Sequence, residues 1–189
     1  MHIVLFGGAF DPPHLGHITV VKNFIELGLA DQLIFLPVHN HAFDKNMLES
    51  NHRLEMLEKV KKNHFKDFPV YTSDYELTKS GMSITFDTLS ELSKQNPQNQ
   101  YSFLIGSDNL ADFDKWHHYQ EMLDKYKFFV YPRAGFSFEN LKEGMIALKD
   151  MPEMKVSSSL VREKLENRDS VEGLLSPEVI HYIKENELY

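Results

Sequence analysis

The sequence predicts an α/β protein built on one open parallel sheet with helices on both faces. Three observations lead to this fold class. Residues 1–37 carry a strand, a helix and a second strand in close succession, and such a unit joins parallel strands. Short apolar runs then alternate with amphipathic helical patterns along the rest of the chain, as in doubly wound proteins. No internal repeat, low-complexity tract or linker interrupts the chain, so we expect residues 1–189 to form a single domain.

The first strand and the first helix enclose an unusual turn. The apolar run HIVLF at residues 2–6 is bounded by glycines and predicts a buried strand. Apolar residues then recur at helical spacing over 15–27, and Gly28 stands where a helix end favours a left-handed residue. QLIFLP at 32–37 predicts the second strand. The stretch FGGAFDPPHLGH at 6–17 is therefore a strand-to-helix turn.

The later elements continue the alternation. They are predicted helices over 51–63 and 84–95 and predicted strands over 101–105 and 127–131. Ser176 and Pro177 are typical of a helix N-cap and a first helical position, so a last helix is expected to begin there. The stretch 38–50 has no clear period, which predicts a loop near the carboxyl edge of the sheet.

Composition and charge restrict the classes of function. Twenty Lys and Arg against 28 Asp and Glu give a net charge of −8, the wrong sign for binding nucleic acid polymers through a basic face. The absence of cysteine excludes disulfides and thiolate metal sites and fits the cytoplasm, which we expect as the compartment. No leader sequence and no apolar run long enough to span a membrane is present, so we expect a soluble protein without a membrane partner. The oligomeric state stays open, homo-oligomers included.

The turn over residues 6–17 has the residues of a phosphate-binding corner. The first strand-to-helix turn of an open parallel sheet lies at the edge where ligands bind, and the helix N-terminus offers free N–H groups and a positive dipole end. Gly7 and Gly8 would let backbone amides approach a phosphate without an intervening Cβ. His14 and His17 project to one face of the helix start, where both can donate to phosphate oxygens. Asp11 and the two prolines after it are expected to fix the turn.

Other interpretations fit this turn less well. A dinucleotide-binding turn needs G-x-G-x-x-G, whereas here only Gly7 and Gly8 precede Ala9. A zinc helix needs H-E-x-x-H, whereas His14 and His17 are three apart with no base between them. A tight turn with a capping aspartate and two surface histidines is the alternative without a catalytic role.

Two short sequence motifs near opposite ends of the chain, called boxes below, resemble motifs of a known protein family. GGAFDPPHLGH at 7–17 resembles the GGxFDPxHxGH signature of the HxGH nucleotidylyltransferases, and VSSSLVR at 156–162 is similar to the ISSTxxR box of that superfamily. Three segments between them, DYELTKSGMSITFDTLSEL at 74–92, FLIGSDNLADFDKW at 103–116 and FFVYPRAG at 128–135, resemble bacterial nicotinate-nucleotide adenylyltransferases in order and spacing. On this resemblance the chain is identified as a member of that family, with a Rossmann-like nucleotidylyltransferase fold.

The resemblance implies a reaction. The 5′-phosphate of nicotinate mononucleotide attacks the α-phosphorus of ATP, which gives the deamido dinucleotide of NAD and pyrophosphate without a covalent enzyme intermediate. Such a transfer depends on in-line positioning and on stabilising charge on the phosphate oxygens. Mg²⁺ is expected to be held mainly by ATP oxygens and water, so no protein ligand for a metal is named.

The resemblance also implies roles for individual residues. His14, His17 and Arg162 are the expected catalytic residues, with the histidines donating to the α- and β-phosphate oxygens and the arginine meeting the departing pyrophosphate. The residues expected to bind the nucleotide are Gly7, Gly8, Ala9, Phe10, Gly106, Asp108, Ser157 and Ser158. The residues expected at the acceptor are Lys45, Thr85, Trp116 and Arg133.

Simpler roles remain open for three of these residues. Asp108 is also suited to cap a helix over 109–114, Trp116 to fill the core, and Arg133 to lie on the surface.

The sequence departs from the family pattern in two stretches near the expected acceptor. Residues 39–45 replace a Pro-Pro-His-Lys segment, and Ile84 replaces the tyrosine of an SYT tripeptide. The acceptor therefore stays open between nicotinate mononucleotide, nicotinamide mononucleotide and phosphopantetheine. A non-catalytic nucleotide-binding relative is the alternative of another class.

Overall fold

The structure, a computed structural model, describes residues 1–39, 47–79, 81 and 83–189. In this part of the chain six parallel strands form one sheet in the order β3-β2-β1-β4-β5-β6. The strands are β1 (His2–Gly8), β2 (Gln32–Pro37), β3 (Val70–Thr72), β4 (Gln100–Gly106), β5 (Lys127–Tyr131) and β6 (Met145–Ala147). The strand order reverses between β1 and β4, as in doubly wound folds that bind nucleotides. The predicted fold class is confirmed.

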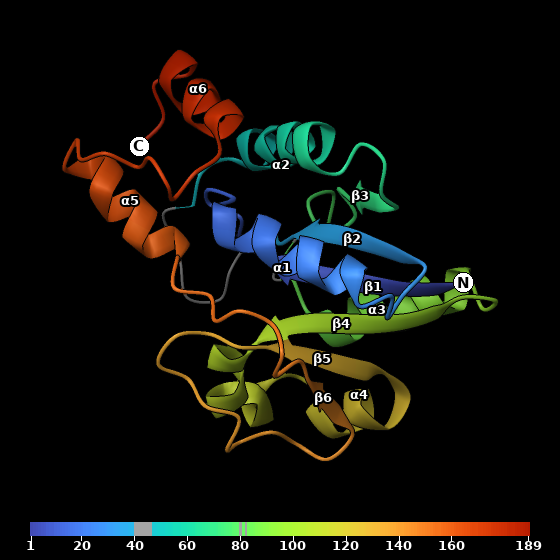
Figure 1. The fold of residues 1–189 in the computed structure, drawn as a ribbon. Coiled ribbons are helices and arrows are strands. Elements are labelled where there is room, and N and C mark those ends of the chain that lie inside the picture. Colours follow the sequence, from blue (N-terminus) through green and yellow to red (C-terminus); the bar gives the residue numbers. More distant parts are fainter. Residues whose placement is uncertain (40–46, 80, 82) are drawn as a thin grey trace.

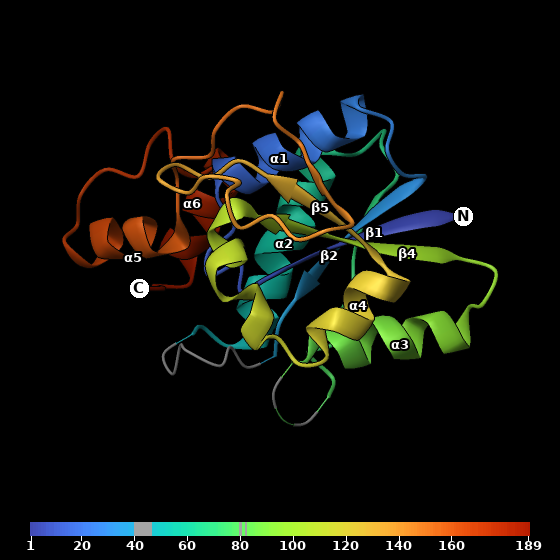
Figure 2. The ribbon, with the colours of Figure 1, turned by 90° about the horizontal axis from the view of Figure 1, so that it is seen from below.

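Helices cover both faces of the sheet (Figures 1 and 2). They are α1 (Leu15–Glu26), α2 (Ser50–His64), α3 (Thr85–Gln95), α4 (Tyr119–Lys125), α5 (Ser158–Glu166), α6 (Pro177–Glu185) and the 3₁₀ helix η1 (Ser107–Lys115). Figure 2 shows α1 on one side of the sheet and α3 with α4 on the other. Within the described residues, no helix is both long and apolar enough to cross a membrane.

The alternation of side chains along β1 explains the two layers of core. Val4 and Phe6 point into a cluster that contains buried residues of α1, α2, α5 and α6. Ile3 and Leu5 point into a second cluster with α3, η1 and α4. Because both faces of the strand are buried, its sequence is a continuous apolar run rather than an alternating one.

The register of the strands brings the turn to the reversal point of the sheet. β1 pairs with β2 on one side and with β4 on the other, so that Phe6 lies between Phe35 and Leu104. The carboxyl ends of β1 and β4 are therefore adjacent. Gly8 ends the first of these strands and Gly106 the second.

The structure revises one predicted helix start and confirms another. The predicted helix over 109–114 is the 3₁₀ helix η1, which begins at Ser107 and has Gly106 rather than Asp108 as its N-cap. The last helix begins at Pro177 with Ser176 as its N-cap residue, as predicted, although the Ser176 side chain makes no capping hydrogen bond within the described residues. The Asp108 carboxylate is used elsewhere, in an ion pair described below.

Candidate active site

The turn after β1 is held by a buried aromatic ring. Phe10 has φ 49°, a left-handed conformation that is rare for a bulky residue, and its side chain is 1% exposed. The ring packs edge-on against Phe6 and Phe35, with centroids 5.6 and 5.5 Å away. Burial of this ring offsets the cost of the backbone conformation. One residue further along, the Asp11–Pro12 peptide bond is cis.

His14 and His17 cap the start of α1 through each other's backbone. The His14 N–H donates to His17 Nδ1 over 3.1 Å, and the His17 N–H donates to His14 Nδ1 over 3.3 Å. The two rings are stacked, with centroids 3.7 Å apart. This reciprocal cap satisfies two N–H groups of the helix start and fixes both rings. The capping aspartate of the simpler interpretation is not the cap that the structure shows.

The reciprocal cap determines which ring nitrogen carries the proton. Burial lowers the pKa of His14 to about 3, with the nearby Arg133 charge adding to the effect. Burial also lowers the pKa of His17 well below its usual value. Both rings are therefore neutral near pH 7, and because each Nδ1 accepts a hydrogen bond, each Nε2 must carry the hydrogen. The helix start presents two uncharged N–H donors.

The second box of the sequence lies directly against this turn. Ser158 Oγ donates to the carbonyl of Pro12 over 3.0 Å, and Arg162 Nη1 donates to the carbonyl of Asp11 over 2.8 Å. Ser157 is the N-cap of α5 and accepts from the Leu160 N–H over 3.2 Å. Figure 1 shows α5 beyond the carboxyl ends of the strands, on the side where α1 begins. The structure thus brings together two segments about 150 residues apart.

Asp108 and Arg133 connect the carboxyl end of β4 with the second box. Arg133 Nε lies 3.5 Å from Asp108 Oδ2, and Arg133 Nη1 donates to the carbonyl of Val156 over 2.8 Å. Gly106 leaves room for this pair, because a Cβ there would lie 2.7 Å from Arg133 Cγ. Arg133 is a partly buried residue of the corner rather than a surface arginine.

Two of the residues expected at the acceptor lie on the α3 and η1 side of the sheet. Thr85 is the first residue of α3. Trp116 follows η1 and is partly buried, with its ring 5.1 Å from Phe113 and 6.4 Å from Phe103 between centroids. Lys45 lies outside the described residues.

Sequence reasoning missed a buried arginine behind the turn. Arg53 is 0% exposed, and its guanidinium donates to the carbonyl of Ala9 over 2.8 Å and to that of Leu48 over 3.0 Å. It thereby joins the turn after β1 to the segment that precedes α2. A signal was present in the sequence: Arg53 falls on the stripe of α2 that also buries Met56, Leu57 and Val60.

A buried glutamate before α3 was also missed. Glu76 is 4% exposed and accepts from Thr88 Oγ1 over 2.7 Å. Burial raises its pKa. Ser83 accepts from the His39 N–H over 3.0 Å, which ties the start of α3 to the segment after β2. These contacts brace the side of the sheet where the acceptor is expected.

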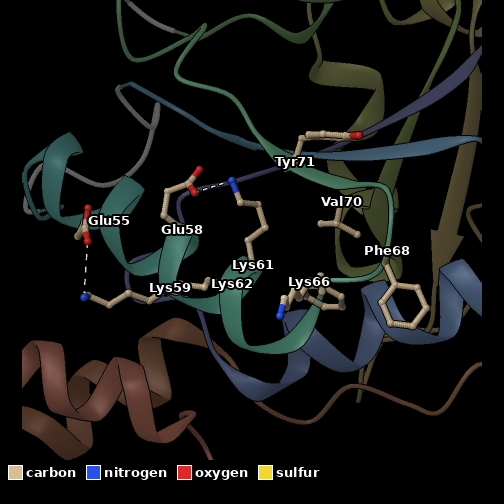
Figure 3. Close-up of a pocket in the computed structure, with 10 residues that line it drawn as sticks. Glu55, Glu58, Lys59, Lys61, Lys62, Lys66, Phe68, Val70 and Tyr71 are labelled. Carbon is tan, nitrogen blue, oxygen red and sulfur yellow. Dashed lines mark ion pairs between the residues drawn. The ribbon is translucent and has the colours of Figure 1, made fainter.

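A separate hollow of about 560 Å³ lies between α2 and β3 (Figure 3). None of its lining residues is among the predicted site residues. Its lysines include Lys59, paired with Glu55, and Lys61, paired with Glu58. These pairs leave the hollow less suited to an anion than the corner around His14.

The donors of the corner suit phosphate oxygens better than a bare cation. Imidazole N–H groups, hydroxyls and guanidinium groups meet there, and all of them can donate hydrogen bonds. Among the residues that the structure describes, no group of three or more His, Asp or Glu side chains could hold a metal ion. Asp108 already pairs with Arg133. A magnesium ion fits this corner as part of a bound nucleotide.

Comparison with known proteins identifies the family. The cytidylyltransferase-like family model matches residues 5–164. The nicotinate-nucleotide adenylyltransferase of Bacillus subtilis is 33% identical over 190 residues, which cover 99% of this chain and 97% of that protein. The chain belongs to the nicotinate-nucleotide adenylyltransferase family. A relative from Oceanobacillus iheyensis, named a probable nicotinate-nucleotide adenylyltransferase, is 32% identical and covers 99% of this chain and 96% of its own length.

Solved structures support the fold of this family member. A Plasmodium falciparum nicotinic acid mononucleotide adenylyltransferase complexed with NaAD matches with a TM-score of 0.89 and 24% identity, covering 100% of this chain and 97% of that one. The same protein complexed with APC matches with a TM-score of 0.87 and 23% identity, covering 100% and 96%. At this identity the likeness concerns the fold. The family expected from the two boxes and the three segments between them is confirmed by the relatives.

Proposed function

We propose that this protein is an adenylyltransferase that joins the AMP moiety of ATP to nicotinate mononucleotide, giving deamido-NAD and pyrophosphate. The observation that carries the proposal is the contact between the HxGH turn and the serine–arginine box, through Ser158 with Pro12 and Arg162 with Asp11. A nucleoside triphosphate has negative charge along its whole phosphate chain. A site that binds it therefore needs hydrogen-bond donors that reach the phosphate oxygens from more than one direction. We expect the reaction in the cytoplasm, since a chain without cysteine suits a reducing compartment.

The triphosphate would be held from two sides. The amides of Gly8, Ala9 and Phe10, with Gly7 leading into the turn, would bind phosphate oxygens at the start of α1. His14 and His17 would donate from Nε2 to the α- and β-phosphate oxygens. A neutral imidazole suits this task, because it donates without requiring a proton to be taken up first.

The leaving pyrophosphate would be met from α5. Arg162 and the hydroxyls of Ser157 and Ser158 would stabilise the negative charge that develops as the bond to the α-phosphorus breaks. Mg²⁺ bound to ATP would neutralise part of that charge. The attacking acceptor phosphate already carries the oxygen nucleophile, so no side chain is needed as a general base.

The carboxyl end of β4 would bind the adenosine. The Asp108 carboxylate is suited to accept from the two ribose hydroxyls, next to Gly106. Its ion pair with Arg133 would hold the carboxylate in place for this contact.

The start of α3 supports a nicotinate acceptor over a nicotinamide one. The N-cap of α3 is Ile84, whose side chain cannot accept the hydrogen bonds of the first helical N–H groups. A carboxylate on the pyridine ring would accept those bonds and interact favourably with the helix dipole, whereas a neutral carboxamide would gain less. Thr85 would orient the ring, Trp116 would stack on it, and Lys45 would bind the acceptor phosphate.

A panel of acceptors tests the proposal. The purified protein is incubated with MgATP and, separately, nicotinate mononucleotide, nicotinamide mononucleotide and phosphopantetheine, and pyrophosphate release is measured. We expect release with nicotinate mononucleotide at a kcat/KM at least tenfold above that with the other two. Faster release with another acceptor would change the assigned acceptor, and release with none would favour a non-catalytic nucleotide-binding protein.

A further inference from the structure

A fully buried carboxylate lies directly behind the phosphate turn. The Asp11 side chain is 0% exposed, and the Tyr189 hydroxyl donates to its Oδ1 over 2.5 Å. On the other oxygen, Oδ2, the Leu48 N–H donates over 3.4 Å and Arg162 Nη1 lies 3.8 Å away. The carboxylate thus has Tyr189 on one oxygen and Arg162 near the other.

Asp11 holds Arg162 in two ways. The same Nη1 that faces the Asp11 carboxylate donates to the Asp11 backbone carbonyl over 2.8 Å. The carbonyl fixes the position of the guanidinium, and the carboxylate charge favours it electrostatically. The rotation of the Asp11 side chain therefore influences where the guanidinium sits at the triphosphate site.

The Tyr189 hydroxyl is suited to fix that rotation. Burial raises the pKa of Tyr189, and the neighbouring Asp11 charge raises it further, so the phenol keeps its proton and remains a donor. Tyr189 follows α6, which packs on α2 (Figure 1). The Tyr182 hydroxyl of α6 lies 2.9 Å from His52 Nδ1 of α2. Tyr189 itself is 36% exposed, but the residue before it, Leu188, packs against the core and donates its N–H to the carbonyl of Ile183 over 3.1 Å. The donor is thus tied to the end of α6 rather than to the turn.

We propose that Tyr189 is a positioning residue for ATP, acting through Asp11 on Arg162. A hydrogen bond to Oδ1 holds the carboxylate so that Oδ2 faces the guanidinium, which keeps Arg162 aimed at the phosphate chain before ATP arrives. This inference rests on the proposed role of Arg162 in binding the triphosphate. Tyr189 itself touches neither ATP nor the acceptor in this scheme.

The substitution Tyr189→Phe tests the proposal, because it removes the hydroxyl and keeps the ring. We expect the KM for MgATP to rise about tenfold, while the KM for the acceptor stays within twofold of the wild-type value. Tyr182→Phe is the matched control, since it also removes a hydroxyl that bonds a neighbouring element. A purely structural role of Tyr189 predicts that both variants lower the melting temperature and leave the KM for MgATP unchanged, which would overturn the proposal.

A double-mutant cycle tests whether Tyr189 influences the MgATP affinity through Arg162. If Tyr189 acts through Arg162, Tyr189→Phe should change the MgATP affinity by less than twofold when Arg162→Lys is already present. The same tenfold effect in both backgrounds would overturn the proposed route.

Affinity for MgATP is also measured by titration calorimetry without acceptor. If the wild-type protein binds MgATP but transfers AMP to no acceptor, the proposed function fails, while the comparison of affinities still decides the role of Tyr189.

Discussion

At the residue scale, the two histidines of the turn cap the start of α1 through each other's backbone. Their reciprocal bonds to backbone N–H groups use both Nδ1 atoms as acceptors. We predict that both rings are neutral and protonated on Nε2 between pH 5 and pH 8 in the free protein. Two-dimensional ¹⁵N–¹H NMR of the ring nitrogens reports the tautomer directly. A ring protonated on Nδ1, or a charged ring at pH 6, would contradict this assignment.

The lowered histidine pKa values make stability depend on pH. The unfolded chain takes up protons on these rings below pH 6.5, whereas folded His14 stays neutral until about pH 3. The unfolded state therefore binds more protons, and the free energy of unfolding falls as the pH is lowered. For His14 alone we expect a loss of about 2 kcal/mol between pH 7 and pH 5.

Urea unfolding of the wild-type protein and of His14→Asn measures this loss. Asparagine caps helices well and does not titrate. The variant should lose about 2 kcal/mol less than the wild-type protein over the same pH range. Equal losses in the two proteins would show that His14 titrates normally.

The sequence allowed us to predict the site residues that belong to a short local motif. It did not allow us to predict those whose role depends on contacts with distant parts of the chain. His14, His17, Ser158 and Arg162 were predicted from two short boxes, and the structure brings these boxes together. Tyr189 was not predicted, because its partner Asp11 lies 178 residues away and no local pattern marks it.

At the scale of elements, the first turn of α1 depends on a residue without a side chain. A Cβ at Gly16 would lie 2.9 Å from two atoms of the His14 ring, closer than side-chain atoms normally approach. The ring cannot move freely, because it is buried and stacked on His17. The start of the helix and the histidine pair are therefore fitted to each other.

We predict that Gly16→Ala lowers kcat/KM by about ten- to a hundredfold, because it displaces the His14 ring. Without that clash, alanine within a helix would add about 0.5–1 kcal/mol of stability. Steady-state kinetics and thermal unfolding measure the two effects separately.

Gly28→Ala at the other end of α1 is the control. Gly28 has φ +62° and no atom within 4 Å of an added Cβ. This variant should lose about 1 kcal/mol of stability through its left-handed backbone and keep its activity. Full activity of Gly16→Ala would show that the close approach has no catalytic consequence.

The central strands and most helices were predictable from sequence, whereas the three-residue edge strands and the helices α4 and α5 were not. The helices α1, α2 and α3 have apolar stripes over several turns. The edge strands β3 and β6 have three residues each and depend on pairing with β2 and β5. Helix α5 buries only Val161 fully, so its periodic signal is weak. Tertiary contacts, rather than local pattern, stabilise these short elements.

At the scale of the whole molecule, we propose that residues 1–189 unfold as one domain. One sheet carries helices from both halves of the chain, and the last helix packs on the second. The single tryptophan, Trp116, reports on the α3 and η1 side of the sheet. Its fluorescence and the far-UV circular dichroism should therefore give the same urea midpoint. Two separate midpoints would indicate two units.

The charge of the whole molecule contrasts with that of the site. The chain has a net charge of −8, yet Arg53, Arg133 and Arg162 all lie within or behind the corner at the start of α1. The proposed binding of a triphosphate would therefore depend on local donors held in fixed positions rather than on attraction by the molecule as a whole. Composition alone did not reveal this concentration of arginines.

In the proposed function, one triphosphate is bound by the HxGH turn and the serine–arginine box together. A crystal structure with Mg²⁺ and an ATP analogue that resists cleavage between the α- and β-phosphorus tests this claim. We predict phosphate oxygens within hydrogen-bond distance of Nε2 of His14 or His17 and, in the same molecule, of the Arg162 guanidinium. A triphosphate that contacts only one of the two segments, or that binds elsewhere, would contradict the account.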